Sequence, residues 1–158
     1  MDGLSLLADG ELFAVDVMRI QKVVRNMAFT PVPAAPDEVV GIANLKGGIV
    51  TLISLAELFG HSRSAKAVHA VIFKSSTGEN SQMGLLVDSP GNLVTIDETG
   101  IIPPHFTAEE CEKTFISGLA EVEGMLYRII DIDAIKNKLK ERGKKTANSI
   151  LQGDIEDD

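Results

Sequence analysis

The chain has 158 residues, a formal net charge of −8 and 44% hydrophobic residues, which suits one compact domain or two small ones that share a core. A single cysteine excludes a disulfide framework, and the negative charge and the lack of tryptophan disfavour a nucleic-acid binder. No basic leader precedes an apolar segment, and no apolar run approaches the roughly 18 residues of a membrane span, so we expect a cytoplasmic protein with no direct membrane insertion.

The first part of the chain predicts short strands separated by turn residues. Asp9-Gly10 has turn chemistry, and the three prolines of Thr30–Pro36 predict a rigid extended connector. Lys46-Gly47-Gly48 predicts a hairpin turn because glycine permits positive φ. The strands are expected at Leu4–Leu7, Leu12–Val17, Ile20–Phe29, Ile42–Leu45 and Ile49–Ser54, with one helical turn at Ala56–Phe59.

The second part continues the same pattern. The strands are expected at Val68–Phe73, Met83–Val87, Leu93–Ile96, Phe115–Val122 and Leu126–Ile132, with Ser89–Asn92 and Glu123-Gly124 as turns. Helices are expected at Ala108–Lys113 and at Ala134–Arg142, the latter with Asp133 as its N-cap. Many short strands punctuated by Gly and Pro predict an all-β barrel or sandwich fold rather than a parallel α/β sheet.

Two segments resemble each other at a constant offset of 118 − 41 = 77 residues. Gly41–Gly47 aligns with Gly118–Gly124, and the apolar register continues without a gap, so that Leu55 meets Ile132 and Leu58 meets Ile135. The repeat predicts two homologous β subdomains, each with one hairpin, at residues 41–55 and 118–132. The copies differ at the turn, where Lys46 stands opposite Glu123, so the first copy is the better candidate for a contact point.

The sequence offers no catalytic or metal-binding constellation. The histidines at 61, 69 and 105 have no shared ligand spacing, and Cys111 lies among glutamates, which raise a thiol pKa and oppose a reactive thiolate. No helix follows the turn at Lys46 that could make it a phosphate site. We therefore expect no enzyme activity, no metal and no cofactor.

Charge is unevenly distributed along the chain. Residues 1–135 hold nine basic and eighteen acidic residues, whereas residues 136–145 hold six basic residues and one acid. The basic segment is expected to be a solvated helix face, and the acidic end of the chain is expected to be flexible.

Several motifs resemble the chemotaxis coupling protein (CheW) family. The segment from Thr30-Pro31-Val32-Pro33 to Gly41-Ile42-Ala43-Asn44-Leu45-Lys46-Gly47 is similar to the family pattern V-P-x-x-P followed by G-x-x-N-L-R-G, and Gly84–Asp88 is similar to its G-φ-φ-V-D strand, where φ is aliphatic. Gly118–Ala120 and Ile129–Ile132 resemble its closing hairpin. The resemblance covers about residues 4 to 140.

The resemblance implies a fold and a function. It implies two five-stranded β-barrels packed side by side over residues 1–140, with a C-terminal helix, and a flexible basic helix end and acidic tail over 141–158. It implies a non-enzymatic adaptor that joins the regulatory domain of a chemotaxis histidine kinase (CheA) to the cytoplasmic tip of chemoreceptors. The receptor-facing groove would involve Ile20, Gly41, Lys46, Gly84 and Gly118, although the glycines also suit close packing and Ile20 also suits the core.

The chain departs from the family pattern where Lys46 replaces an arginine, which exchanges a planar bidentate donor for a point charge. Two alternatives stay open at this stage. The chain could be a regulatory or coupling domain separated from a larger kinase or receiver-containing protein, or a small-ligand-binding β-barrel. A deep apolar pocket with converging polar groups would favour the latter.

Overall fold

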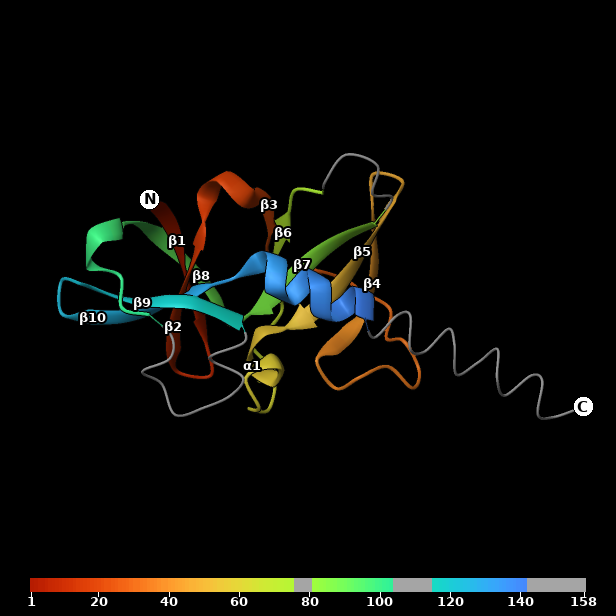
Figure 1. Cartoon of the computed structure of the whole chain (residues 1–158). Helices are drawn as coiled ribbons and strands as arrows, with labels where there is room; N and C mark the ends of the chain where they lie inside the picture. The colour runs from red at the N-terminus through yellow and green to blue at the C-terminus, as the bar shows by residue number, and fades with distance from the viewer. Residues whose placement is uncertain (76–80, 104–114, 142–158) are drawn as a thin grey trace, which may run out of the picture.

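A computed structural model of the chain describes residues 1–75, 81–103 and 115–141 (Figure 1). These residues form mostly β structure, as the sequence predicts. The strands are β1 (Asp2–Ala8), β2 (Glu11–Asp16), β3 (Ile20–Val24), β4 (Val39–Leu45), β5 (Gly48–Ser54), β6 (His69–Phe73), β7 (Ser81–Val87), β8 (Ser89–Thr95), β9 (Ile116–Val122) and β10 (Met125–Ile130). The helical elements are α1 (Leu55–Leu58), the 3-10 turns η1 (Val17–Arg19) and η2 (Glu98–Gly100), and a helix over residues 132–141.

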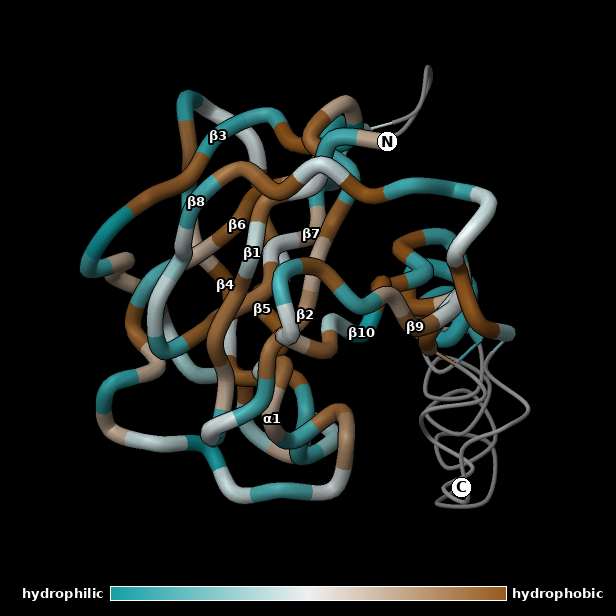
Figure 2. Tube along the Cα trace, turned by 90° about the vertical axis from the view of Figure 1, so that its left-hand side faces the viewer, coloured by the Kyte–Doolittle hydropathy of each residue, from teal (hydrophilic) through white to brown (hydrophobic). Residues whose placement is uncertain are grey.

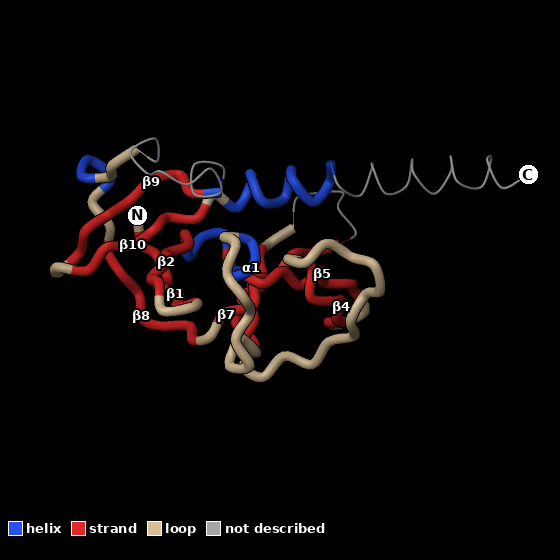
Figure 3. The backbone as a smooth tube through the Cα atoms, turned by 90° about the horizontal axis from the view of Figure 1, so that it is seen from below, coloured by secondary structure: helices blue, strands red, loops and turns tan. Residues whose placement is uncertain are grey.

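The strands form two five-stranded sheets that lie side by side (Figure 3). Sheet A has the order β8-β1-β2-β10-β9, and sheet B has the order β3-β6-β7-β5-β4. Each is antiparallel except for one parallel pair, β10 with β2 and β5 with β7. Within the described residues, the outer strands of each sheet do not pair with each other, so the expected barrels are open rather than fully closed.

The two halves of the chain exchange strands between the sheets. The first half places β1 and β2 in sheet A and β3 to β5 in sheet B, whereas the second half places β6 and β7 in sheet B and β8 to β10 in sheet A. Each sheet is therefore built from both halves. The two halves of the chain therefore cannot separate without breaking hydrogen-bonded ladders.

Three hydrophobic clusters match this arrangement. One lies inside sheet B around Leu52 and Ile72, and a smaller one lies inside sheet A around Ala14 and Ile129. The largest cluster joins both sheets and both helices, with Phe13 from β2 and Phe73 from β6 among its eighteen buried residues. Figure 2 shows the hydrophobic stretches gathering along β5, β6 and β7 in the middle of the molecule. The central cluster makes the two sheets one folding unit.

The structure confirms the 77-residue repeat down to single hydrogen-bonding positions. Gly41 pairs with Leu52 in the first hairpin, and Gly118 pairs with Ile129 in the second, each offset by 77. Both hairpins have a register shift at the same place, between Val39 and Gly41 and between Ile129 and Ile130. The repeat is therefore structural and not a chance agreement of aliphatic residues.

The two hairpin turns are also equivalent. Lys46 and Gly47 have φ of 50° and 81°, and Glu123 and Gly124 have φ of 52° and 79°. Positive φ at both central residues defines a type I′ turn, whose twist matches that of the flanking strands. Glycine at the second position adopts this backbone with no steric cost.

The prediction that Asp133 caps the last helix is wrong. The helix begins at residue 132, and Asp131 is the cap, because its Oδ1 accepts a hydrogen bond from the Ala134 amide at 3.1 Å. In the first copy the equivalent residue is Ser54, whose hydroxyl accepts from the Glu57 amide at 3.2 Å. The repeat itself holds this signal, since 54 + 77 = 131.

A second expectation also fails at β8. Ser89–Asn92 is not a turn but the first half of β8, which follows β7 after Asp88 alone. Pro90 is buried there and pairs with Leu6 across a register shift. Proline is tolerated because β8 is an edge strand at a bulge. The expected helix at Ala108–Lys113, together with His105, Cys111 and residues 142–158, lies outside the described residues.

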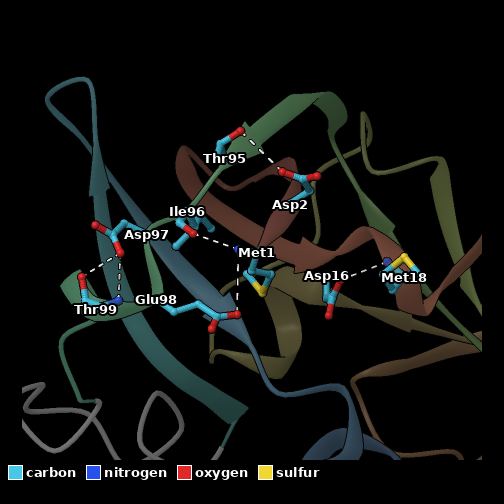
Figure 4. A network of polar contacts seen from close by, with 9 residues as sticks. All are labelled: Met1, Asp2, Asp16, Met18, Thr95, Ile96, Asp97, Glu98 and Thr99. Carbon is cyan, nitrogen blue, oxygen red and sulfur yellow. Dashed lines mark hydrogen bonds and ion pairs between the residues drawn. The ribbon is translucent and has the colours of Figure 1, made fainter.

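The first residue of the chain is held against sheet A (Figure 4). The Met1 amino group donates to the Ile96 carbonyl at 3.0 Å and lies 3.8 Å from a carboxylate oxygen of Glu98. Next to it, Asp97 accepts from both the amide and the hydroxyl of Thr99, and these hydrogen bonds lower the pKa of Asp97. This network fixes η2 beside the start of β1.

Candidate functional site

The β4–β5 hairpin has one buried and one exposed face. Ala43 and Val50 point into sheet B and are buried, whereas Ile42, Asn44 and Ile49 are exposed on the other face. The alternation of buried and exposed positions near the tip follows from the two-residue period of a strand. Ile49 is 53% exposed, which is unusual for a large aliphatic residue in the middle of a well-formed hairpin. The exposed face thus carries the apolar side chains of Ile42 and Ile49 and the polar side chain of Asn44.

Lys46 lies at the tip of this hairpin. Its backbone is held in the left-handed region, and its side chain is exposed. It is five positions after Gly41, so it lies about 16 Å along the strand from that glycine. The tip therefore carries a positive charge on the same hairpin as the exposed side chains of Ile42 and Ile49.

Gly41 and Gly84 lie on one row across sheet B, on either side of Leu52. Both are buried. A Cβ on Gly84 would lie 2.7 Å from Ile72 Cδ1 and 3.0 Å from Leu52 Cδ2, and a Cβ on Gly41 would overlap the Thr30 carbonyl oxygen. These glycines let neighbouring groups approach the backbone, so any part they take in binding is through the shape of the hairpin.

Ile20 and Gly118 lie elsewhere. Ile20 opens β3, pairs with Phe73 and packs half-buried against the central cluster. Gly118 belongs to sheet A, where a Cβ would overlap the Ile101 side chain. The structure therefore gathers Gly41 and Gly84 in one sheet row, with Ile20 on another strand of the same sheet. It does not bring all five candidate residues into a single pocket.

A shallow depression runs along the β4 side of the hairpin, and the sequence analysis did not find it. It is lined by residues 28–30 and by residues of the hairpin itself, among them Ile42 and Ile49. The Arg63 guanidinium lies 5.8 Å from the centre of the Phe29 ring, within the range of a cation–π contact. Phe29 directly precedes the proline connector Thr30–Pro36. This aromatic residue is the sequence feature that could have indicated the depression.

A second depression lies between β8 and the tip of the β9–β10 hairpin. Its lining is mixed, with Ser5, Asn92 and Glu123 beside Leu93 and Met125. Leu93 is 70% exposed and Met125 49% exposed. The two hairpin tips lie at opposite ends of the molecule (Figures 1 and 3). Neither depression is the deep apolar pocket with converging polar groups that a small-ligand barrel would need.

Nothing in the described part of the chain resembles an active site. No group of three His, Cys, Asp or Glu residues there could hold a metal ion. His61 and Asp9 approach each other at 3.0 Å across two loops, and Arg19 and Asp133 form a surface ion pair at 2.7 Å. No helix of the described residues is long and apolar enough to cross a membrane.

Comparison with known proteins agrees with this geometry. The family model of the CheW-like domain matches residues 2–140. The chain belongs to the CheW family. Among its relatives are the chemotaxis protein CheW of Rhizobium meliloti, 26% identical over 78% of this chain and 79% of that protein, and CheW of Thermotoga maritima, 29% identical over 84% and 85%.

A solved structure shows the same fold. The scaffolding protein TtCheW of Thermoanaerobacter tengcongensis matches with a TM-score of 0.72 and 28% identity, over 83% of this chain and 88% of that one. The CheW family consists of non-enzymatic scaffold proteins of chemotaxis, and this chain is one of them. Its two subdomains are therefore surfaces for other proteins rather than walls of a catalytic site.

Proposed function

We propose that this CheW-family chain couples the cytoplasmic tips of chemoreceptors to the regulatory domain of the chemotaxis kinase CheA, in the cytoplasm. The observation that carries the proposal is the β4–β5 hairpin, which exposes Ile42 and Ile49 beside the cationic tip at Lys46. An adaptor needs apolar surface that a partner can bury, and neighbouring exposed apolar groups with polar residues around them are typical of a protein–protein interaction site. The named relatives are CheW proteins rather than kinases, which favours an adaptor over a fragment of a kinase.

The receptor surface is assigned to the hairpin of sheet B. The receptor tip is expected to be a helical hairpin, whose apolar residues at helical spacing can pack on Ile42, Ile49 and the edge of Phe29. Lys46 would meet a carboxylate or a helix C-terminus of the receptor. Gly41 and Gly84 would keep the hairpin flat against its neighbours, whereas Ile20 on β3 and Gly118 in sheet A would require a receptor contact that extends beyond the hairpin.

The kinase surface is assigned to the other end of the molecule. There Leu93 on the edge strand β8 and Met125 on β10 are the most exposed apolar groups, next to the acidic residue Glu123. An edge strand with exposed aliphatic residues is a natural place for another β domain to dock. Separate ends allow one chain to hold both partners at once.

The receptor assignment is tested by Lys46→Glu. We expect a loss of receptor-tip affinity of about tenfold, because a favourable charge contact becomes a repulsive one. The matched control is Lys66→Glu, which makes the same charge change at an exposed loop position. The measurement is co-sedimentation with purified receptor tips. Equal affinity of the two variants would contradict the assignment of Lys46.

The kinase assignment is tested by Leu93→Asp. We expect weaker binding to the CheA regulatory domain with receptor binding retained, since Leu93 lines the depression at the β9–β10 tip, and that tip lies at the opposite end of the molecule from the β4–β5 tip. Titration of each partner separately measures this. If wild-type protein bound neither receptor tips nor CheA, the adaptor proposal would fail.

A further inference from the structure

The segments that follow β2 and β10, two neighbouring strands of sheet A, contact each other outside the sheet. β2 and β10 are parallel neighbours, so both run out of sheet A in the same direction. After β2 the chain passes through η1 into β3 of sheet B, and after β10 it enters the helix of residues 132–141. These two exits connect the sheets, and one of them leads directly to Ile20.

Arg19 and Asp133 join the two exits. The two guanidinium nitrogens Nη1 and Nη2 donate to the carboxylate oxygens Oδ2 and Oδ1 at 3.2 and 2.7 Å, a bidentate contact across 114 residues of sequence. Bidentate Arg–carboxylate pairs fix orientation as well as distance, because the donor fork is planar. The contact lowers the pKa of Asp133 and raises that of Arg19.

The same region holds a second link between the helix and sheet B. The Lys136 ammonium donates to the Lys74 carbonyl at 3.0 Å, and the Lys74 amide donates to the Arg19 carbonyl at 2.9 Å. Together these contacts close a ring through Arg19, Asp133, Lys136 and Lys74. We call these four residues the crossover clamp.

Both ends of the clamp are locally rigid. Asp16 accepts from the Met18 amide at 3.0 Å and so caps η1, while Asp131 caps the helix. Ile20 follows Arg19 directly, and its amide donates to the Val17 carbonyl. On the helix, Ile135 is buried in the central cluster and Leu139 packs against it. The clamp therefore connects two capped segments, and both the helix and Ile20 also pack against the central cluster.

The region that follows the parallel strand pair of sheet B differs from the crossover clamp. There β5 and β7 are the parallel neighbours, and they lead into α1 and β8. The residue that aligns with Asp133 at the 77-residue offset is Ala56, which has no charge. Among the described residues, the aligned position of the first copy therefore cannot form the same ion pair, and because exposed ion pairs add little to stability we expect the pair to act on orientation rather than on stability.

We infer that the crossover clamp is a positioning device for the adaptor. Arg19 and Asp133 fix the orientation of the C-terminal helix relative to the strand that begins with Ile20, which is one of the candidate receptor contacts. This inference rests on the proposed function for its receptor readout, and on the structure alone for the position of the helix.

The test uses charge reversal and its repair in the full chain. Arg19→Glu and Asp133→Lys each break the bidentate contact, and the double variant restores a pair of opposite charges. Arg25→Glu is the matched control, because it makes the same charge change at an exposed position beyond the other end of β3. Far-ultraviolet circular dichroism checks that every variant is folded.

Two readouts separate the clamp from the proposed function. In hydrogen exchange, each single variant is expected to speed exchange at Ile20 and in the first turns of the helix, with β9 and β10 unchanged, and the double variant to slow it again. In receptor-tip binding, each single variant is expected to lose about 3- to 10-fold in affinity, with the double variant within about 2-fold of wild type.

The outcomes are distinct. Restored exchange in the double variant, with no receptor binding by the wild type, would support the clamp as a structural device while the adaptor proposal failed. Receptor binding by the wild type with purely additive losses in the double variant would overturn the clamp. Unchanged exchange and affinity in both single variants would overturn it as well.

Discussion

The two hairpin copies share a backbone but not a surface. Both have a type I′ turn, a buried glycine at the same ladder position and a capped helix directly after the second strand. They differ where the chain meets solvent, with Lys46 at one tip and Glu123 at the other, and in the helix that follows. The comparison teaches that the repeat supplies the scaffold and that its divergence gives the two hairpin tips unlike exposed surfaces.

The helices carry the largest difference between the copies. α1 spans Leu55–Leu58 and is followed by Gly60 at a φ of 82°, whereas the equivalent helix continues to at least residue 141. Glycine at positive φ commonly ends a helix. The second copy has Asn137 at that position, so its helix continues across the face of sheet B. Only the second copy therefore has a helix long enough to carry the crossover clamp.

The largest expected difference between the two hairpins comes from replacing their equivalent glycines, Gly41 and Gly118. Gly41→Ala would force a Cβ into the Thr30 carbonyl oxygen, which is backbone, whereas Gly118→Ala would meet the Cγ2 methyl of Ile101, a stiff β-branched side chain, and would lie 3.0 Å from the Ile102 carbonyl oxygen. We expect losses in unfolding free energy of about 3 and about 2 kcal/mol, respectively, from overpacking. Urea unfolding measures both. A larger loss at Gly118 would show that the two hairpins tolerate strain in the opposite order.

The capping residues give a smaller effect and test the corrected helix start. Asp131→Ala and its equivalent Ser54→Ala should each reduce stability by about 1 kcal/mol, because each removes the acceptor for a first-turn amide. Asp133→Ala, which leaves the cap intact, should cost less in thermal unfolding. A greater loss at Asp133 than at Asp131 would contradict the assignment of Asp131 as the cap.

The smallest expected effect is the pH dependence of the clamp, which has no counterpart in the first copy. The hydrogen bond from Arg19 lowers the pKa of Asp133 in the folded state, so the pair stabilises the fold above the unfolded value of about 4. This contribution disappears as the pH falls through the lower folded pKa. Asp133→Asn should therefore have a flatter acid limb in its stability curve than wild type. The difference should be small, because the Asp133 side chain is 68% exposed. An identical acid limb in both proteins would argue against the ion pair.

The sequence alone determined the local structure well, because local structure depends on nearby residues. Alternating aliphatic residues located the two hairpins, and the Gly pattern at an offset of 77 showed that they are copies. It also identified the family through the residues from Pro31 to Gly47. It failed at Pro90, where the strand continues because the edge of a sheet needs no amide donor.

Only the tertiary structure decided how the copies are combined. The exchange of strands between the sheets depends on contacts between residues far apart in the sequence, and the pairing of β2 with β10 joins residues more than a hundred positions apart, which no local pattern encodes. The same holds for the contact between Arg19 and Asp133, because nothing in the sequence indicates that these two charged residues pair. The buried positions of Gly41, Gly84 and Gly118 likewise follow from packing across strands. This packing distinguishes the three glycines from Lys46, which faces solvent.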